Sequence, residues 1–196
     1  MELSARSKLL LHTCCAPCAS YALEYLSPSY EITTFFYNPN ILPGEEHGRR
    51  AAELGRLLAL ARYPNPVGSL GCRYDPEAFG VAAGPYEDEP EGGERCRICF
   101  ELRLGETARR AEEGGYGYFA TTLSVSPHKD AGQINEIGGR LERKYVAGGP
   151  GYLRQAPRYL PLDLKKGGGF KRSVELSKLH GLYRQGYCGC RPAFAK

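Results

Sequence analysis

Residues 8–20 read KLLLHTCCAPCAS, an apolar run that stops at a cluster of three cysteines. The run at 8–12 predicts a short buried strand, because its leucines leave no polar face for solvent. Pro17 suits the first turn of a helix, where its missing N–H group is not needed. Apolar residues then recur at helical spacing over 19–26. The cysteine cluster is therefore expected in the turn between a strand and a helix.

The rest of the chain continues this alternation of strands and helices. Further strands are predicted at 31–37, 116–122 and 159–162, and further helices at 45–62, 77–81, 96–113, 129–143 and 174–179, with 63–93 otherwise mostly loop. Such alternation predicts a mainly parallel sheet flanked by helices, a Rossmann-like or HUP-like α/β fold. We expect a single domain over residues 1–196.

Sites in open parallel sheets lie beyond the carboxyl ends of the strands. Cys14 and Asn38 fall just after a predicted strand, and Thr122 falls at the end of one. The sequence therefore predicts a loop-rich cysteine site at that edge of the sheet.

Composition predicts a soluble, intracellular protein. Of 196 residues, 42% are hydrophobic and 24% are charged, as in ordinary globular domains. The chain has no stretch near the roughly 18 apolar residues of a membrane span, and its first apolar run is too short for a signal peptide. We expect a cytoplasmic protein without a membrane partner.

Positive charge gathers near the C-terminus. Residues 151–196 hold ten Lys and Arg against two acids, whereas the whole chain has a net charge of +4. A basic segment of this kind is typical of a surface that binds a polyanion such as nucleic acid, although solvated surface charges give the same count.

Seven of the eight cysteines form three motifs, and Cys72 stands alone. The motifs are Cys14-Cys15-Ala16-Pro17-Cys18, Cys96-Arg97-Ile98-Cys99 and Cys188-Gly189-Cys190. Clustered cysteines in a reducing compartment usually bind metal or carry out redox chemistry. Four thiolates suit a structural Zn²⁺ or an iron–sulfur cluster, and the spacing favours iron–sulfur without deciding it.

The third motif has a second interpretation. Two cysteines separated by one glycine close only a small ring, so a disulfide there is strained and easily reduced. Cys188 and Cys190 are therefore candidates for a redox pair, with a second metal site or two free thiols as alternatives.

Two other residues, Asp163 and His12, each allow more than one interpretation. Asp163 is a candidate proton donor or metal ligand, or else the ion-pair partner of Lys165 and Lys166. His12 follows the first strand beside the cluster and is more simply explained as a buried histidine than as a ligand.

These motifs together resemble the epoxyqueuosine reductases of the QueH type. The resemblance covers almost the whole chain and rests on LLLHTCCAPCA (9–19), FFYNPNI (35–41), EDEPEGGERCRICFELRL (87–104), TTLSVSPHKD (121–130), LDLKK (162–166) and ELSKLHGLYRQGYCGC (175–190). Residues 146–158 depart from the family's pattern and indicate a loop insertion.

The resemblance implies an oxidoreductase that acts on tRNA. It implies that epoxyqueuosine at the wobble position of the anticodon is reduced to queuosine, the last step of queuosine synthesis, with electrons from a donor that the sequence does not identify. The implied [4Fe–4S] ligands are Cys14, Cys15, Cys96 and Cys99, and the implied redox-active pair is Cys188 and Cys190. An additional mononuclear iron is also implied, with Cys18, Asp75 and Asp163 as candidate ligands.

Two other function classes remain to be distinguished from this one. A zinc-stabilised RNA-binding module without catalysis would use the basic segment and the cysteines but leave the C-x-C pair idle. A tRNA thiolase or adenylating enzyme would share the fold, but the chain lacks a pyrophosphate-binding Ser/Gly loop.

Overall fold

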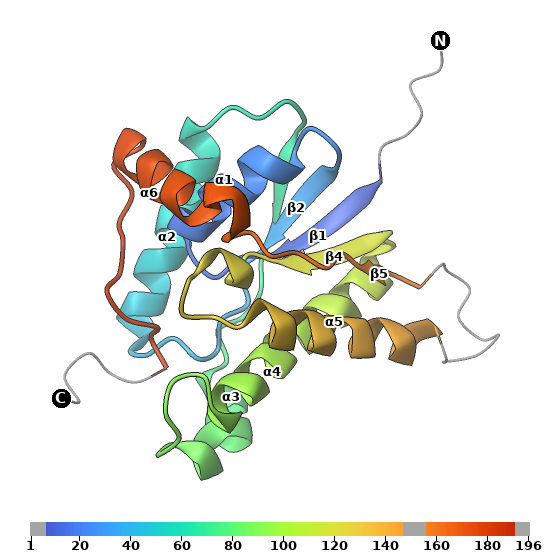
Figure 1. The fold of residues 1–196 in the computed structure, drawn as a ribbon, viewed down its shortest axis with the longest axis vertical. Helices are drawn as coiled ribbons and strands as arrows, with labels where there is room; N and C mark the ends of the chain where they lie inside the picture. Colours follow the sequence, from blue (N-terminus) through green and yellow to red (C-terminus); the bar gives the residue numbers. More distant parts are fainter. Residues whose placement is uncertain (1–6, 147–155, 191–196) are drawn as a thin grey trace.

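The computed structural model describes residues 7–146 and 156–190, which contain one five-stranded parallel sheet (Figure 1). Its strands are β1 (Lys8–His12), β2 (Glu31–Phe35), β3 (Val67–Leu70), β4 (Tyr118–Thr121) and β5 (Arg158–Tyr159). Their order across the sheet is β3-β2-β1-β4-β5, and all neighbouring strands are parallel. This is the strand order of a doubly wound α/β sheet, so the predicted architecture is confirmed.

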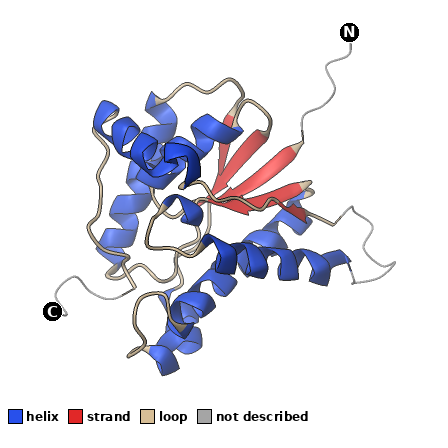
Figure 2. Ribbon diagram, in the orientation of Figure 1, coloured by secondary structure: helices blue, strands red, loops and turns tan. Residues whose placement is uncertain are grey.

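Helices cover both faces of the sheet (Figure 2). They are α1 (Ala16–Leu26), α2 (Gly44–Leu60), α3 (Pro76–Ala83), α4 (Glu94–Gly114), α5 (Ala131–Val146) and α6 (Gly169–Leu179), with short 3₁₀ turns at Gly84–Tyr86, Leu123–Val125 and Lys166–Gly168. In Figure 1, α1, α2 and α6 lie on one side of the sheet and α4 and α5 on the other. Over the described ranges, each helix is too short or too polar to cross a bilayer.

The leucines of β1 divide the core between these two layers. Leu9 and Leu11 pack against one side, with Leu23 of α1 among their neighbours. Leu10 points the other way and packs with Leu104 of α4. All are fully buried, because alternate strand residues point to opposite faces and helices cover both.

Strands β1, β2 and β4 end at the same level of the sheet. His12 is in register with Phe35 of β2 and with Thr121 of β4. The strand order reverses between β1 and β4, since β1 continues into α1 on one face and β4 leads to α5 on the other. Doubly wound sheets open their binding crevice at this point.

The segments that follow these strands meet at this crevice. The backbone N–H of Cys14 donates a hydrogen bond to Thr122 Oγ1 at 3.2 Å. The side-chain amide of Asn38 donates to the carbonyl of Thr13 at 2.9 Å. The predicted convergence of Cys14, Asn38 and Thr122 is therefore confirmed.

The structure also corrects several predicted elements. The stretch predicted as loop at 63–93 contains strand β3, a half-exposed edge strand with a glycine at its second position and so a weak sequence signal. The last strand is limited to Arg158–Tyr159, and α6 begins at Gly169, five residues earlier than expected. Most of the expected insertion at 146–158 lies outside the described residues.

Candidate functional site

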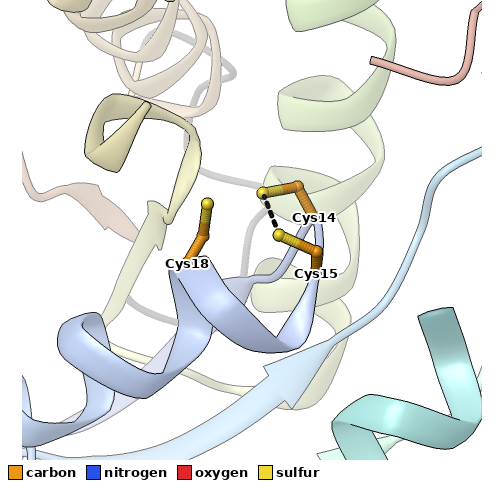
Figure 3. Close-up of side chains that lie close together, drawn as sticks. All are labelled: Cys14, Cys15 and Cys18. Atoms are coloured by element: carbon orange, nitrogen blue, oxygen red, sulfur yellow. Dashed lines mark hydrogen bonds between the residues drawn. The ribbon is translucent and has the colours of Figure 1, made fainter. Parts of the chain in front are cut away.

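Three N-terminal cysteines share one pocket at the start of α1. Cys15 is the N-cap residue of this helix, Pro17 lies in its first turn, and Cys18 follows on the next position. The sulfur atoms of Cys14, Cys15 and Cys18 all lie within 4.8 Å of one another. Figure 3 shows these side chains turned toward one another, with a dashed line between the Sγ atoms of Cys14 and Cys15, 3.8 Å apart.

This spacing fits sulfur ligands on one metal centre. In a tetrahedral site with metal–sulfur bonds of about 2.3 Å, neighbouring sulfur atoms lie about 3.8 Å apart. Hydrogen bonds from the thiols of Cys15 and Cys18 hold the pKa of Cys14 well below its usual range, with a smaller contribution from Thr122. The same hydrogen bond with Cys14 keeps the proton on Cys15 and raises the pKa of Cys15 to about 12. The group thus already stabilises one thiolate, the form that binds metal.

The second cysteine motif lies on α4, beside the first. Cys96 and Cys99 are three residues apart on one face of the helix, and both are buried. Cys96 belongs to the core cluster against which Cys14 packs, and Cys99 to the small cluster that contacts Cys190. Among described residues, however, the group of sulfur atoms within 4.8 Å consists of Cys14, Cys15 and Cys18, without Cys96 or Cys99.

Cys188 and Cys190 reach the site of the N-terminal cysteines from the other end of the chain. After α6 the chain returns past α2 (Figure 1), where the Arg50 guanidinium donates to the carbonyls of Cys188 at 2.8 Å and Tyr187 at 3.3 Å. Arg50 is buried and paired with Glu46 at 2.6 Å. The backbone N–H of Leu42 donates to the carbonyl of Gly189 at 2.8 Å. Helix α2 and the loop before it therefore both hold the Cys188-Gly189-Cys190 segment.

The two thiols of this pair have different surroundings. Cys188 lines the cavity described below and lies 3.6 Å from Nζ of Lys129. Cys190 instead packs in the cluster that contains Phe79 and Cys99. A hydrogen bond from the Cys190 thiol, the charge of Lys129 and a smaller contribution from Arg103 hold the pKa of Cys188 well below its usual range. Both cysteines are reduced in the structure.

A cavity of about 400 Å³ joins these groups. Its walls include Cys14, Cys15, Cys18, Arg103, Lys129 and Cys188. Its lining also includes Phe170 at the start of α6, and Arg184 and Gln185 in the segment after that helix. The arrangement brings thiols and cations from four separate segments to one space large enough for a nucleoside-sized ligand.

Asp163 lies at a neighbouring cavity that it lines together with Lys165 and His128. Its carboxylate forms ion pairs with Lys165 at 3.1 Å and Lys166 at 3.5 Å. The ion-pair interpretation of Asp163 is therefore confirmed, and its role as a proton donor or ligand stays a prediction. Asp75 caps the start of α3 by accepting a hydrogen bond from the N–H of Ala78.

His12 is fully buried and has a structural role. Its Nε2–H donates to the carbonyl of Tyr37 at 3.1 Å, so its Nδ1 accepts from the hydroxyl of Thr121 at 2.8 Å. Burial, and then the charge of Arg103, lowers the pKa of His12 to about 3. The imidazole is therefore neutral, which confirms the simpler interpretation.

The sequence interpretation missed two buried arginines at this site, Arg50 and Arg103. Arginines are usually exposed, and composition gives no sign of which ones are covered. One signal was present: Cys96, Cys99 and Arg103 recur at spacings of three and four, which places them on one face of a helix.

The chain is similar to known proteins along most of its length. The family model described as "Epoxyqueuosine reductase QueH" matches residues 9–196, a range that contains every cysteine of the chain. The protein of that name from Streptococcus pyogenes serotype M1 is 42% identical over 189 residues, which cover 95% of this chain and 70% of that protein. The protein of the same name from Thermotoga maritima is 34% identical over 191 residues, which cover 93% of this chain and 88% of that protein. The solved structure of the U34-tRNA thiolase NcsA from Methanococcus maripaludis with its [4Fe-4S] cluster has a TM-score of 0.49 and 14% identity, covering 94% of this chain and 59% of that one.

Proposed function

The chain belongs to the epoxyqueuosine reductase QueH family, and from this premise we propose that it reduces epoxyqueuosine in the tRNA anticodon to queuosine. One observation carries this proposal. The thiol of Cys188 and the sulfur group of Cys14, Cys15 and Cys18 open into one cavity, although they come from opposite ends of the chain.

The proposed reaction balances in electrons and protons. Removing the epoxide oxygen as water, with formation of a carbon–carbon double bond, consumes two electrons and two protons. Oxidation of the Cys188 thiolate and the Cys190 thiol to a disulfide releases two electrons and one proton, and solvent in the cavity supplies the second proton. We propose that this pair is the two-electron reservoir of the site, and that an external donor reduces it again.

The charged groups around Cys188 suit such a step. Lys129 is 8% exposed and donates to both the Cys188 sulfur and the carboxylate of Glu91, at 3.6 and 2.7 Å. An ammonium group on the cavity wall stabilises negative charge that develops on an oxygen nearby. In this proposal Lys129 keeps Cys188 ionised and stabilises the epoxide oxygen as it leaves.

The donor chemistry of the cysteine motifs suits a resident iron–sulfur centre. We propose Cys14, Cys15, Cys96 and Cys99 as the ligands of a [4Fe–4S] cluster, which when bound supplies electrons one at a time. Cys18 lies within 4.8 Å of two of these sulfur atoms and is the candidate ligand for an additional mononuclear iron. Asp75 and Asp163, the other candidates, have partners of their own on α3 and in the lysine pairs.

The cavity mouth suits an unpaired nucleotide. Phe170 lines the cavity with 39% of its surface exposed, and the guanidinium of Arg184 lies 5.9 Å from its ring centre. Splayed bases of RNA loops stack on aromatic rings and on arginine planes. We propose that the wobble nucleoside enters here, that the basic segment 151–196 attracts the anticodon arm, and that the protein works in the cytoplasm, where tRNA is modified.

The deciding experiment combines metal analysis with turnover. Anaerobically purified protein should contain about four or more irons per chain and convert epoxyqueuosine in tRNA to queuosine. Cys96→Ala should lose both iron and turnover, whereas Cys188→Ser should keep its iron and lose turnover. A colourless protein with one zinc, or a Cys188→Ser variant with full turnover, would contradict the proposal.

Binding of RNA is tested separately. Loss of one stacking contact costs about 1–3 kcal/mol, so Phe170→Ala should raise the KM for tRNA roughly tenfold with a smaller change in kcat. Tyr25→Ala removes another exposed ring, 58% accessible on α1 and away from the cavity, and should leave KM unchanged. Equal effects of both variants would argue against a nucleoside site at Phe170.

A further inference from the structure

Arg103 is a buried cation without an acidic partner. It lies on α4, is 2% exposed, and lines the cysteine cavity. Its Nε donates to the carbonyl of Cys99 at 3.2 Å and its Nη1 to Oδ1 of Asn38 at 3.3 Å. Both acceptors are neutral, and no carboxylate within residues 7–146 and 156–190 forms an ion pair with it.

Arg50 is a second buried arginine, and it has the acidic partner that Arg103 lacks among the described residues. It is buried to the same extent at the same cavity, and Glu46 neutralises it at 2.6 Å. A buried charge without a counter-charge costs several kcal/mol, so buried arginines are normally paired. The neutral acceptors of Arg103 receive hydrogen bonds from its Nε and Nη1 but leave its charge uncompensated.

Cysteine side chains share the cavity with Arg103, and Cys14 and Cys188 are the ones among them whose pKa lies well below the usual range. Cys99, Cys188, Cys14 and Cys190 lie close enough for their charge, when they are ionised, to act on its guanidinium, although burial raises the pKa of Cys99 to about 11. They come from all three cysteine motifs. His12, the nearby imidazole, is neutral because burial and Arg103 itself prevent its protonation. Cys14 and Cys188 are therefore the thiolates available as a counter-charge to Arg103, together with any cysteine that is ionised when it binds metal.

We propose that Arg103 is the counter-cation of the cysteine centre and raises its reduction potential. A fixed, buried positive charge stabilises the form of the centre that carries the additional electron. Arg103 is held in place from both sides, by its own helix through Cys99 and by the segment after β2 through Asn38. This inference rests on the proposed iron–thiolate centre, and it assigns Arg103 a positioning and tuning role rather than contact with substrate.

The test is a redox titration of the iron-loaded protein followed by electron paramagnetic resonance. Arg103→Gln removes the charge and should move the midpoint potential of the centre to a more negative value. Arg103→Lys keeps the charge and should stay near the wild-type potential. Arg109→Gln removes a charge from the same helix at an exposed pair with Glu106, and should leave the potential unchanged.

A second variant addresses the same charge without altering Arg103. Asn38→Asp places a carboxylate against the guanidinium and gives up the hydrogen bond to the carbonyl of Thr13, so the folded variant should also show a more negative potential. If Arg103→Gln does not fold, this variant and Arg103→Lys decide the matter.

The outcomes separate this inference from the proposed function. Wild-type protein without iron would defeat the proposed function itself. An iron-loaded Arg103→Gln or Asn38→Asp variant with wild-type potential would overturn the role of Arg103 alone. A shift in Arg103→Lys as large as that in Arg103→Gln would also overturn it, because geometry rather than charge would then be responsible.

Discussion

The ammonium group of Lys129 lies 3.6 Å from the sulfur of Cys188, across 59 positions of sequence. Lys129 follows the turn after β4, and Cys188 lies in the returning segment after α6. This contact links the C-x-C motif to the carboxyl edge of the sheet and distinguishes Cys188 from Cys190.

Lys129→Met should slow the alkylation of Cys188 at neutral pH. The positive charge of Lys129 helps to hold the pKa of Cys188 below its usual range, so its removal raises that pKa and lowers the thiolate fraction. Each pKa unit corresponds to about a tenfold change in the ionisation equilibrium. Iodoacetamide labelling, followed by mass spectrometry of the Cys188 peptide across pH, measures the shift. Lys166→Met removes an 81% exposed lysine side chain and should change nothing, whereas equal slowing in both variants would contradict a specific contact.

Arg50→Met should destabilise the protein strongly. Removing one partner of a buried ion pair leaves the other charge uncompensated, at a cost of about 3–5 kcal/mol, and Glu46 would be left in that state. Urea unfolding measures the free energy. The double variant Glu46→Gln/Arg50→Met should recover part of the loss, and Arg172→Met, at an exposed pair with Glu24, serves as the control. A double variant less stable than Arg50→Met would argue against the pairing.

Two adjacent glycines of α5 should respond in opposite directions to alanine. A Cβ atom at Gly138 would overlap the ring of Tyr159, whereas at Gly139 its nearest neighbour is the end of Arg143 at 3.6 Å. Gly138→Ala should therefore cost about 1–3 kcal/mol through overpacking. Gly139→Ala should stabilise the helix by about 0.5–1 kcal/mol. Thermal unfolding of both variants checks the pair, and equal midpoints would contradict the described packing of Tyr159.

Acid should weaken the fold through His12. Its folded pKa of about 3 lies below the ordinary value of 6.5, so between these values the unfolded chain binds the additional proton. Stability is therefore retained above pH 6.5 and falls as the pH drops, by up to about 1.4 kcal/mol per pH unit from this group. His12→Gln cannot take up that proton and should show a flatter profile in urea titrations at pH 4 to 7. Identical slopes in the two proteins would exclude His12 as the cause.

Local patterns predicted the central part of the fold well. Residues 9–11 are all leucine, so neither face of this segment is polar, and the pattern predicts a strand that is covered on both faces. Pro17 marks the start of the helix after it. These signals act between neighbouring residues. Strand β3 was missed because an edge strand has one neighbour and a weaker apolar pattern, so its pairing with β2 decides its conformation.

The candidate site was predictable in its ingredients but not in its arrangement. Three cysteine motifs are visible in the sequence, and the placement of Cys14 at the strand edge followed from topology. The grouping of Cys18 with Cys14 and Cys15 depended on the first turn of α1, which carries Cys18 toward their sulfur atoms. That detail comes from backbone geometry in three dimensions.

The amino-acid sequence by itself determined the alternation of strands and helices, the cysteine chemistry and the resemblance to a reductase family, since each depends on residue type and short-range spacing. Only the tertiary structure decided that Arg103 has no carboxylate partner among the described residues, that Arg50 has one, and that Cys188 rather than Cys190 contacts Lys129. The physical reason is that burial and charge pairing depend on contacts between distant segments, whose distances no local pattern records.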